Sequence, residues 1–355
     1  MTQSYLFNQV NMDSWARLSL YESTDLVKNL FYQRHGRYPN TGKAQEIVSA
    51  IAQGREYFNA AAEAGLLVRP VLQYYGVLSL SRGLILLLSP NLRETALPQA
   101  HGLSSNGWGE QLSNKQPGEL SIAVTKGTFL TLMEHTGNFE MPWVFTGPYP
   151  DRLILARSHP TEQLVDIRFT FEDVLSRTPE LREIFEKTFN KSASNYLSFL
   201  FSIHGAHTDI DIFPGIHGIP EEEILRQQLT IPIDTEINYT YQHNFVHTMG
   251  HYKYRLPHPT DSSWLECLPQ FENVSATHSA LIVPFQNDMR ISKLGRYFLL
   301  AFFLGTLSRY HPTYWLGIMQ GRQNGDFIMP AIREVMNIIQ ENYCALIINE
   351  LEGQA

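Results

Sequence analysis

Two residues that could act together lie beside a proline in the segment Ser308-Arg309-Tyr310-His311-Pro312. Arg309 and His311 could bind an anion, or act on a phosphodiester with the histidine as acid or base. The alternative is structural, because a cation near a helix C-terminus complements the helix dipole, and a residue before proline leaves helical geometry. We take Arg309 and His311 as candidate catalytic residues. If Arg309 only caps the helix, it would contribute at most about 2 kcal/mol to the free energy of unfolding. If it is half of a buried ion pair, its removal would lower that free energy by roughly 3–5 kcal/mol.

A second candidate lies in the polar stretch 91–118, which has little periodicity and is expected to form a long loop. Within it stands His101-Gly102-Leu103-Ser104-Ser105. Serine hydroxyls and glycine amides can cradle a phosphate, so His101, Ser104 and Ser105 are candidate ligand-binding residues, together with Arg82. Local spacing is no evidence for a catalytic triad, whose members meet through the fold. The alternative is a loop that only covers the helical body.

A third candidate is a dense group of metal-ligand side chains formed by His204, His207, Asp209 and Asp211. Imidazole and carboxylate together suit a divalent metal such as zinc, manganese or iron. On a strand, Asp209 and Asp211 would face the same side, as two ligands of one ion must. The helical HExxH signature is absent, and the 13 histidines of the chain will form some clusters by chance.

Three further histidines, His243, His247 and His251, have spacing that fits one face of a helix or of a strand. Gly250 and the β-rich surroundings favour a strand, with solvated or stacked histidines. The sequence contains no GxxxxGK[ST], no GxGxxG after a strand and no GxSxG. These absences argue against the P-loop, Rossmann and α/β-hydrolase classes.

Composition and charge place the chain among ordinary globular proteins. It has 355 residues, 43% of them hydrophobic, and a net charge of −8, which does not suit a general nucleic-acid binder but leaves room for a local basic patch. The two cysteines, Cys267 and Cys344, are distant in sequence and suit a reducing compartment. The N-terminus has no signal-peptide pattern, and the longest uninterrupted apolar run is Tyr297–Leu307, which is short for a membrane span. We expect a cytoplasmic protein without a membrane contact.

Two helices that are apolar on nearly every side must position these residues. They are expected at Val71–Leu88 and within Ile291–Tyr310, and the simplest way to bury both is to pack one against the other. A final amphipathic helix is expected at Phe327–Leu351. The middle of the chain instead favours strands rich in Ile, Val, Thr, Phe and Tyr. The predicted fold class is a mainly helical α+β protein.

The domain organisation that follows is a discontinuous helical bundle with an insertion. Residues 1–118 and 290–355 would form the bundle, and residues 119–289 a mixed insertion that contains the strands. Both buried helices end near the candidate residues Arg82, His101, Arg309 and His311. We therefore expect these four residues to lie in one neighbourhood, within a pocket of ordinary size.

Several of these segments together resemble the bacterial YaaC-like protein family. The resemblance rests on the stretch Glu56–Leu88, on HGLS at His101–Ser104, on KGTFLTLMEHTG at Lys126–Gly137, and most of all on LLAFFLGTLSRYHPTYW at Leu299–Trp315. The family implies a soluble bacterial protein. It implies no particular reaction.

Three classes of function remain open. The first is a binding module for an anionic ligand, either a nucleotide or a nucleic acid, or a subunit of a stress or defence assembly with a protein partner or a second copy of the chain. The second is a metal-dependent hydrolase that uses the His204–Asp211 group. The third is a metal-independent ribonuclease similar to the HEPN type, although those enzymes separate arginine and histidine by more residues than Arg309 and His311 are separated.

Overall fold

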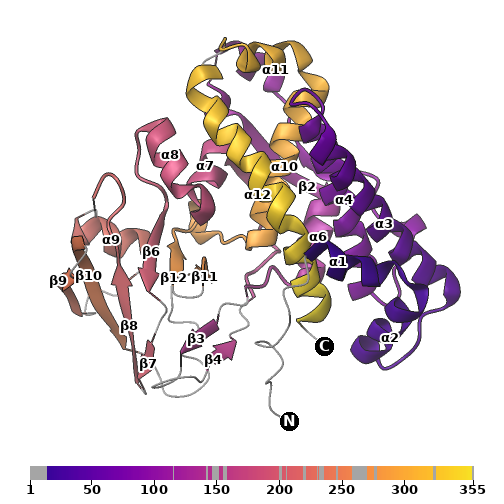
Figure 1. Ribbon diagram of the computed structural model, residues 1–355, viewed down its shortest axis with the longest axis horizontal. Coiled ribbons are helices and arrows are strands. Elements are labelled where there is room, and N and C mark those ends of the chain that lie inside the picture. The colour runs from indigo at the N-terminus through magenta and orange to yellow at the C-terminus, as the bar shows by residue number, and fades with distance from the viewer. Residues whose placement is uncertain are drawn as a thin grey trace.

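The protein is mainly helical, with small sheets, in a computed structural model (Figure 1). The structure describes residues 14–114, 116–140, 143–145, 152–154, 158–199, 202–204, 206–218, 221–229, 231, 236–244, 247–257, 270–275, 278–322 and 325–353. The helices are α1 Ser14–Ser19, α2 Thr24–His35, α3 Thr41–Glu63, α4 Arg69–Leu88, α5 Trp108–Asn114, α6 Thr128–Thr136, α7 Phe171–Ser176, α8 Arg182–Phe189, α9 Glu222–Leu229, α10 Lys293–Tyr310, α11 Pro312–Met319 and α12 Gly325–Glu352. This confirms the predicted mainly helical α+β class.

The strands of the described residues form three sheets. Their orders are β1-β2-β5, β4-β3-β7-β8-β10-β9 and β11-β12-β6. The strands are β1 His101–Ser104, β2 Ser121–Gly127, β3 Trp143–Phe145, β4 Arg152–Ile154, β5 Arg168–Thr170, β6 Asn195–Phe199, β7 Ser202–His204, β8 His207–Ile212, β9 Glu236–Asn244, β10 His247–Pro257, β11 Phe271–Asn273 and β12 His278–Ile282. Pairing is antiparallel except between β3 and β7, so repeated βαβ units are absent from this part of the chain.

The two apolar helices predicted from the sequence, α4 and α10, pack against each other in antiparallel fashion. The Ser308 hydroxyl near the end of α10 donates to the Leu67 carbonyl, just before α4, at 2.6 Å. Close contact needs a glycine at residue 305, because a Cβ there would lie 2.6 Å from the Tyr74 Cβ. With α3 and α12, these helices form the body at the right and centre of Figure 1.

The helical body holds one continuous apolar core into which both ends of the chain contribute. Ile51 and Phe58 of α3, Leu80 of α4, Phe298 of α10 and Tyr343 of α12 are all buried. Segments from the two ends of the chain therefore lie side by side, as Figure 1 shows for the indigo α4 and the yellow α12. The burial of this much apolar surface is the main source of stability for the body.

The sheet β1-β2-β5 and helix α6 belong to this body. The boundary expected at residue 118 therefore separates β1 from β2, which pair directly through Ser104 and Ala123. Helix α6 packs against α4, and its Phe129 and Leu132 are buried in the same core. The reason is that a short strand such as β1 satisfies its backbone hydrogen bonds only beside a neighbour, and the neighbour comes from the other side of the boundary.

The prediction of a long loop at 91–118 is wrong. This stretch contains a 3-10 helix at Glu94–Ala96, strand β1, helix α5 and a second 3-10 helix at Pro117–Glu119. Trp108 at the start of α5 is 1% exposed, and its indole N–H donates to the Ser121 carbonyl at 2.6 Å. Backbone pairing and one buried indole thus order a stretch that has no hydrophobic periodicity.

The middle of the chain forms the six-stranded sheet at the lower left of Figure 1. The predicted strand character of the histidine-rich segment is confirmed for the backbone, since His243 lies in β9 and His247 and His251 lie in β10. These two strands form an antiparallel hairpin in which Thr240 faces His251.

Helix α4 is long and apolar enough to cross a membrane by length and composition alone, and it is the one such helix in the part of the chain that the structure describes. The share of its most apolar stretch that lies buried inside the protein is 67%. Helices α3, α10 and α12 pack against α4 and cover much of its apolar surface.

Candidate functional site

Arg309 occupies the last turn of α10, where the helix ends at His311 and α11 begins with Pro312. One of its guanidinium nitrogens donates to the hydroxyl of Tyr75 on α4. The guanidinium carbon also lies 4.1 Å from the centre of the Tyr310 ring and 5.5 Å from that of the Tyr75 ring. Arg309 makes no ion pair with a carboxylate of the described residues, so its charge is held by rings and one hydroxyl.

His101 enters this region from β1. The pairing of β1 with β2 is irregular between His101 and Leu103, and Gly102 there has φ 83°, a value that favours glycine. The ring of His101 lies 5.4 Å from that of Tyr74 and 6.1 Å from that of Phe302. Burial lowers the pKa of His101, and Arg309 lowers it further. His101 is therefore neutral at pH 7.

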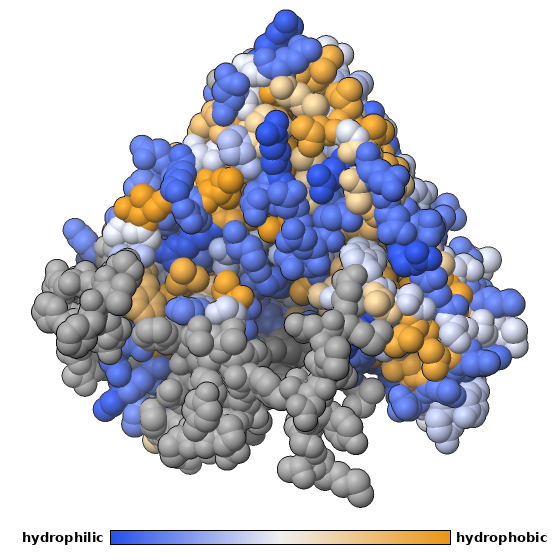
Figure 2. All heavy atoms as spheres, in the orientation of Figure 1, coloured by the Kyte–Doolittle hydropathy of each residue, from blue (hydrophilic) through white to orange (hydrophobic). Residues whose placement is uncertain are grey.

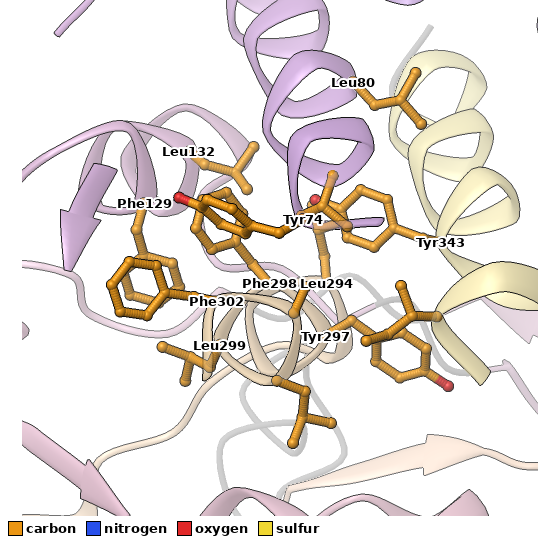
Figure 3. Packing of buried hydrophobic residues seen from close by; sticks show 14 of the residues in the cluster. Tyr74, Leu80, Phe129, Leu132, Leu294, Tyr297, Phe298, Leu299, Phe302 and Tyr343 are labelled. Atoms are coloured by element: carbon orange, nitrogen blue, oxygen red, sulfur yellow. The ribbon is translucent and has the colours of Figure 1, made fainter. Parts of the chain in front are cut away.

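Two buried polar atoms of this region have no hydrogen-bond partner among the described residues: the Tyr74 hydroxyl and the Nδ1 atom of His101. Tyr74 is 3% exposed and its ring lies among Phe129, Phe298 and Phe302 (Figure 3). Burial raises the pKa of Tyr74, with Arg309 opposing, so the hydroxyl keeps its proton and remains a donor. Buried polar groups are normally paired, so two unpaired atoms beside an arginine are a feature that needs an explanation.

His311 contacts a different element from Arg309. Its ring lies 5.9 Å from that of Trp108 on α5, and burial lowers its pKa. Arg309 instead turns to Tyr75 on α4. The charge of Arg309 therefore acts on His101, whose pKa it lowers. Arg309 and His311, which were predicted to act together, make no direct contact in the described structure.

The two candidate serines have local structural roles beside α5. The Ser104 hydroxyl accepts from the Asn106 amide at 3.2 Å, and the Ser105 carbonyl accepts from the Trp108 amide at 3.1 Å. These bonds form the turn that leads into α5. Ser104 and Ser105 remain half-buried, so they border the region without pointing to a ligand of their own.

Arg82 lies apart from the other candidates, which is a correction to the single neighbourhood expected from the sequence. Because α4 and α10 run antiparallel, the end of α10 meets the start of α4, and Arg82 is seven residues beyond Tyr75, about 10 Å along the helix. Its guanidinium donates to the Pro98 carbonyl at 3.4 Å. Arg82 lines a separate cavity of about 170 Å³, together with Gln53 and Glu94.

One carboxylate of the metal group predicted at His204–Asp211, that of Asp209, is engaged in cross-strand ion pairs. The residues His207, Asp209 and Asp211 do share one face of β8. Arg255 and Lys253 of β10 stand opposite Asp209 and Asp211, and Arg255 donates to both carboxylate oxygens of Asp209 at 2.9 and 3.2 Å. This hydrogen bonding lowers the pKa of Asp209, with burial opposing.

The side chain of His204 lies outside the described residues. Within the described ranges, no group of three or more His, Cys, Asp or Glu side chains comes together as a metal site. Strand geometry places Asp209 and Asp211 on one face, as expected, but the neighbouring strand supplies Arg255 and Lys253 as ion-pair partners of Asp209.

A buried charged group at the other end of α10 was missed in the sequence. Arg296 is fully buried, donates to the Glu272 carboxylate, and donates to the Ile291 carbonyl at 2.7 Å. Lys293 pairs with Glu180 and lies 3.9 Å from Glu272. Burial raises the pKa of Glu272, with Arg296 and Lys293 opposing. Burial works to lower the pKa of Arg296, but Glu272 and Glu140 outweigh it and raise that pKa.

This group extends to Glu140, which accepts from the Gln270 amide and lies 3.3 Å from the Nε2 atom of His159. One signal in the sequence could have revealed it: Lys293 and Arg296 are cations in a helix that is otherwise apolar, and buried cations require carboxylate partners. The partners come from segments distant in sequence. Lys293 and Arg296 each have a carboxylate partner, so their charges are balanced within the group, which fits a connection between the body and the middle of the chain. Four buried atoms of the group nevertheless have no hydrogen-bond partner among the described residues: Arg296 Nε, Glu272 Oε1, Glu180 Oε2 and His159 Nε2.

The chain was compared with known proteins. A family model described as YaaC-like Protein matches residues 14–351, nearly the whole chain, and the resemblance seen in the sequence is confirmed. No curated protein and no solved structure matches the chain. The matched range includes both ends of α10 and every element that positions Arg309 and His101.

Proposed function

The chain belongs to the YaaC-like protein family, and on that premise we propose that it binds the phosphate of a nucleotide, or of a nucleic-acid end, beside Arg309. The family supplies no reaction, so support comes from the site itself. The single observation that carries the proposal is the set of partners around Arg309. They are a tyrosine hydroxyl and two tyrosine rings, with no carboxylate among the described residues.

An anion would complete this arrangement. A phosphate oxygen is a strong acceptor for a guanidinium and for a phenolic hydroxyl, and such charge-assisted bonds are about twice as strong as neutral ones. The Tyr74 hydroxyl lies buried beside Arg309 with no acceptor in the described structure, and the neutral ring of His101 keeps a second unpaired atom. A bound anion would accept from the Tyr74 hydroxyl, and from His101 in the tautomer that carries its proton on Nδ1, so it would satisfy buried donors that otherwise cost free energy.

The surroundings suit the base of a nucleotide. The ring of Tyr310 is 59% exposed, and Tyr75 stacks on Tyr57 with ring centres 5.6 Å apart. Flat rings beside an arginine are typical of sites that stack bases while they hold a phosphate. Figure 2 shows hydrophobic residues among polar ones at the top of the molecule, over α11 and the start of α12. Leu316 of α11 and Phe327 of α12 are exposed there.

The two enzymatic alternatives have less support. The described carboxylate most central to the predicted metal group, Asp209, is bonded to Arg255. The predicted ribonuclease pair is directed to different helices, Arg309 to Tyr75 and His311 to Trp108. Binding requires only the arginine and its neighbours, so it is the function that the geometry favours.

The test is binding of two probes to the full-length protein at low salt. One is a nucleoside monophosphate measured by calorimetry, and the other is a short 5′-phosphorylated single strand measured by fluorescence anisotropy, with the unphosphorylated strand beside it. The Arg309→Gln variant should weaken binding of the phosphorylated probes about tenfold or more.

The matched control is Arg168→Gln, which removes an exposed arginine from β5 and should leave affinity unchanged. The proposal fails if neither phosphorylated probe binds the unaltered protein, or if Arg309→Gln binds as well as that protein does. A preference for the phosphorylated strand over the mononucleotide would identify the nucleic-acid end as the ligand.

A further inference from the structure

A second cavity, of about 380 Å³, lies where the turn after α2, the start of α3 and the segment after α4 meet. This volume is in the range of small-molecule sites. The side chains that matter for its chemistry are Arg37, Tyr38, Asn40, Lys43, Asn91 and Arg93. Leu88, the last residue of α4, is thirteen residues beyond Tyr75, or about 20 Å along the helix, so the cavity is distinct from the region around Arg309.

The cavity carries an excess of positive charge in a chain whose net charge is −8. Arg93 is paired with Glu46 at 2.6 Å. Arg37 donates instead to the amide oxygen of Asn91 at 2.6 Å, and Lys43 donates to the backbone carbonyls of Ser89, at 3.1 Å, and Leu92. Neither of these two cations has a carboxylate within ion-pair distance among the described residues.

Lys43 is a buried part of this cavity. It is 2% exposed, and a lysine is almost never buried so completely without a charged partner. It stands in the first turn of α3, whose N-cap Asn40 accepts from the Lys43 amide at 2.8 Å. The positive end of the dipole of α3, a helix of 23 residues, therefore adds to the charge of Arg37 and Lys43.

A flat ring accompanies the charges. Tyr38 lines the cavity, is 61% exposed, and stacks on Tyr32 with ring centres 4.5 Å apart and an angle of 20° between the rings. The amide of Asn91, also in the lining, can bond to polar edges of a ligand. A large exposed ring beside two cations that lack a carboxylate partner suits a ligand that is flat at one end and anionic at the other.

We propose that this cavity binds a free nucleoside phosphate, with the phosphate on Arg37 and Lys43 at the start of α3 and the base against Tyr38. The site is separate from the one beside Arg309 and does not depend on it. The phosphate supplies the negative charge that Arg37 and Lys43 lack, and the ring of Tyr38 supplies the stacking surface.

The experiment is calorimetric titration of the full-length protein with a nucleoside monophosphate, a nucleoside diphosphate, the parent nucleoside and inorganic phosphate. Arg37→Gln should weaken nucleoside phosphate binding at this site about tenfold or more. Tyr38→Leu should weaken the nucleotides but leave inorganic phosphate unchanged. Both side chains are exposed, so both variants should fold, which circular dichroism will verify.

Two further variants separate this site from the other one. Arg309→Gln removes the other proposed site, so the nucleoside phosphate binding that remains in that variant should come from this cavity and should be weakened by adding Arg37→Gln. Arg333→Gln, which removes an exposed arginine from α12, should change nothing. The proposal is overturned if nucleoside phosphates do not bind, if inorganic phosphate binds as tightly as they do, or if Arg37→Gln and Tyr38→Leu bind like the unaltered protein. Loss of all nucleotide binding in Arg309→Gln would also overturn it, and would assign that binding to Arg309.

The pH dependence offers a second readout. Burial lowers the pKa of Lys43 to about 8, with Glu46 opposing and Arg93 assisting. Lys43 therefore carries its charge at pH 7 and loses it as the pH rises above 8. Nucleoside phosphate affinity should fall between pH 7 and pH 9.5, and a flat profile would contradict the contact with Lys43.

Discussion

At its N-terminal end α10 places Arg296 in an enclosed group of carboxylates, whereas at its C-terminal end it places Arg309 among tyrosine rings. Arg296 is fully buried and paired with Glu272, while Arg309 is only partly buried and has no carboxylate partner among the described residues. The two arginines lie on one helix, less than 20 Å apart along its axis at about 1.5 Å per residue. They therefore differ in surroundings rather than in the element that carries them.

The difference shows how burial determines what a charge can do. A fully buried cation is tolerated only with a close carboxylate, and Glu272 balances the charge of Arg296 from within the protein. A partly buried cation can keep some solvation and can remain without a counterion. The Arg309 end therefore retains binding capacity, and the unpaired hydroxyl of Tyr74 adds to it.

The largest effect should come from Arg296→Met. This change leaves the Glu272 carboxylate buried without its main partner, with Lys293 3.9 Å away, so we expect a loss of roughly 3–5 kcal/mol in the free energy of unfolding. Chemical denaturation followed by circular dichroism measures it. A loss below about 1 kcal/mol would mean that Glu272 does not depend on Arg296 as its main partner.

Arg309→Gln should have a smaller effect on stability. With no carboxylate left behind, the loss is limited to the dipole and ring contacts, at most about 2 kcal/mol. The same denaturation experiment decides between the cap and the buried ion pair that the sequence left open. A loss as large as that of Arg296→Met would erase the contrast between the two ends of α10.

Much of the helical framework could be predicted from the sequence. A helix that is buried on all sides and a proline that ends a helix both leave signals in the local sequence. The apolar runs gave α4 and α10, and Pro312 marked the end of α10. The partners of the charges could not be predicted in this way. Arg296 meets Glu272 and Arg309 meets Tyr75 through the packing of segments distant in sequence.

The candidate site was predictable only in part for the same reason. His101 was a sound candidate, but its place beside Tyr74 depends on a strand that forms only by pairing with β2. The prediction placed Arg82 beside Arg309 because the local sequence carries no signal that α4 and α10 run antiparallel. The cavity at Lys43 was missed, since a lysine in the first turn of a helix gives no sign that it will be buried.

The smallest effect distinguishes an unpaired hydroxyl from a paired one in the same core. Tyr343 on α12 shares a 2.7 Å hydrogen bond with Ser81, so Tyr343→Phe should cost about 1 kcal/mol of unfolding free energy. Tyr74→Phe removes a buried hydroxyl that has no partner among the described residues, and should cost nothing measurable or stabilise slightly.

The effects of these two variants on probe binding should be the reverse of their effects on stability. Tyr74→Phe should weaken the phosphorylated probes, because the hydroxyl beside Arg309 is then missing, whereas Tyr343→Phe should leave their affinity unchanged. A stability loss of about 1 kcal/mol in Tyr74→Phe, with unchanged probe binding, would show that its hydroxyl already has a partner in the free protein. The C-terminal end of α10 would then have no unpaired hydroxyl beside Arg309, and the reason to place a ligand there would be gone.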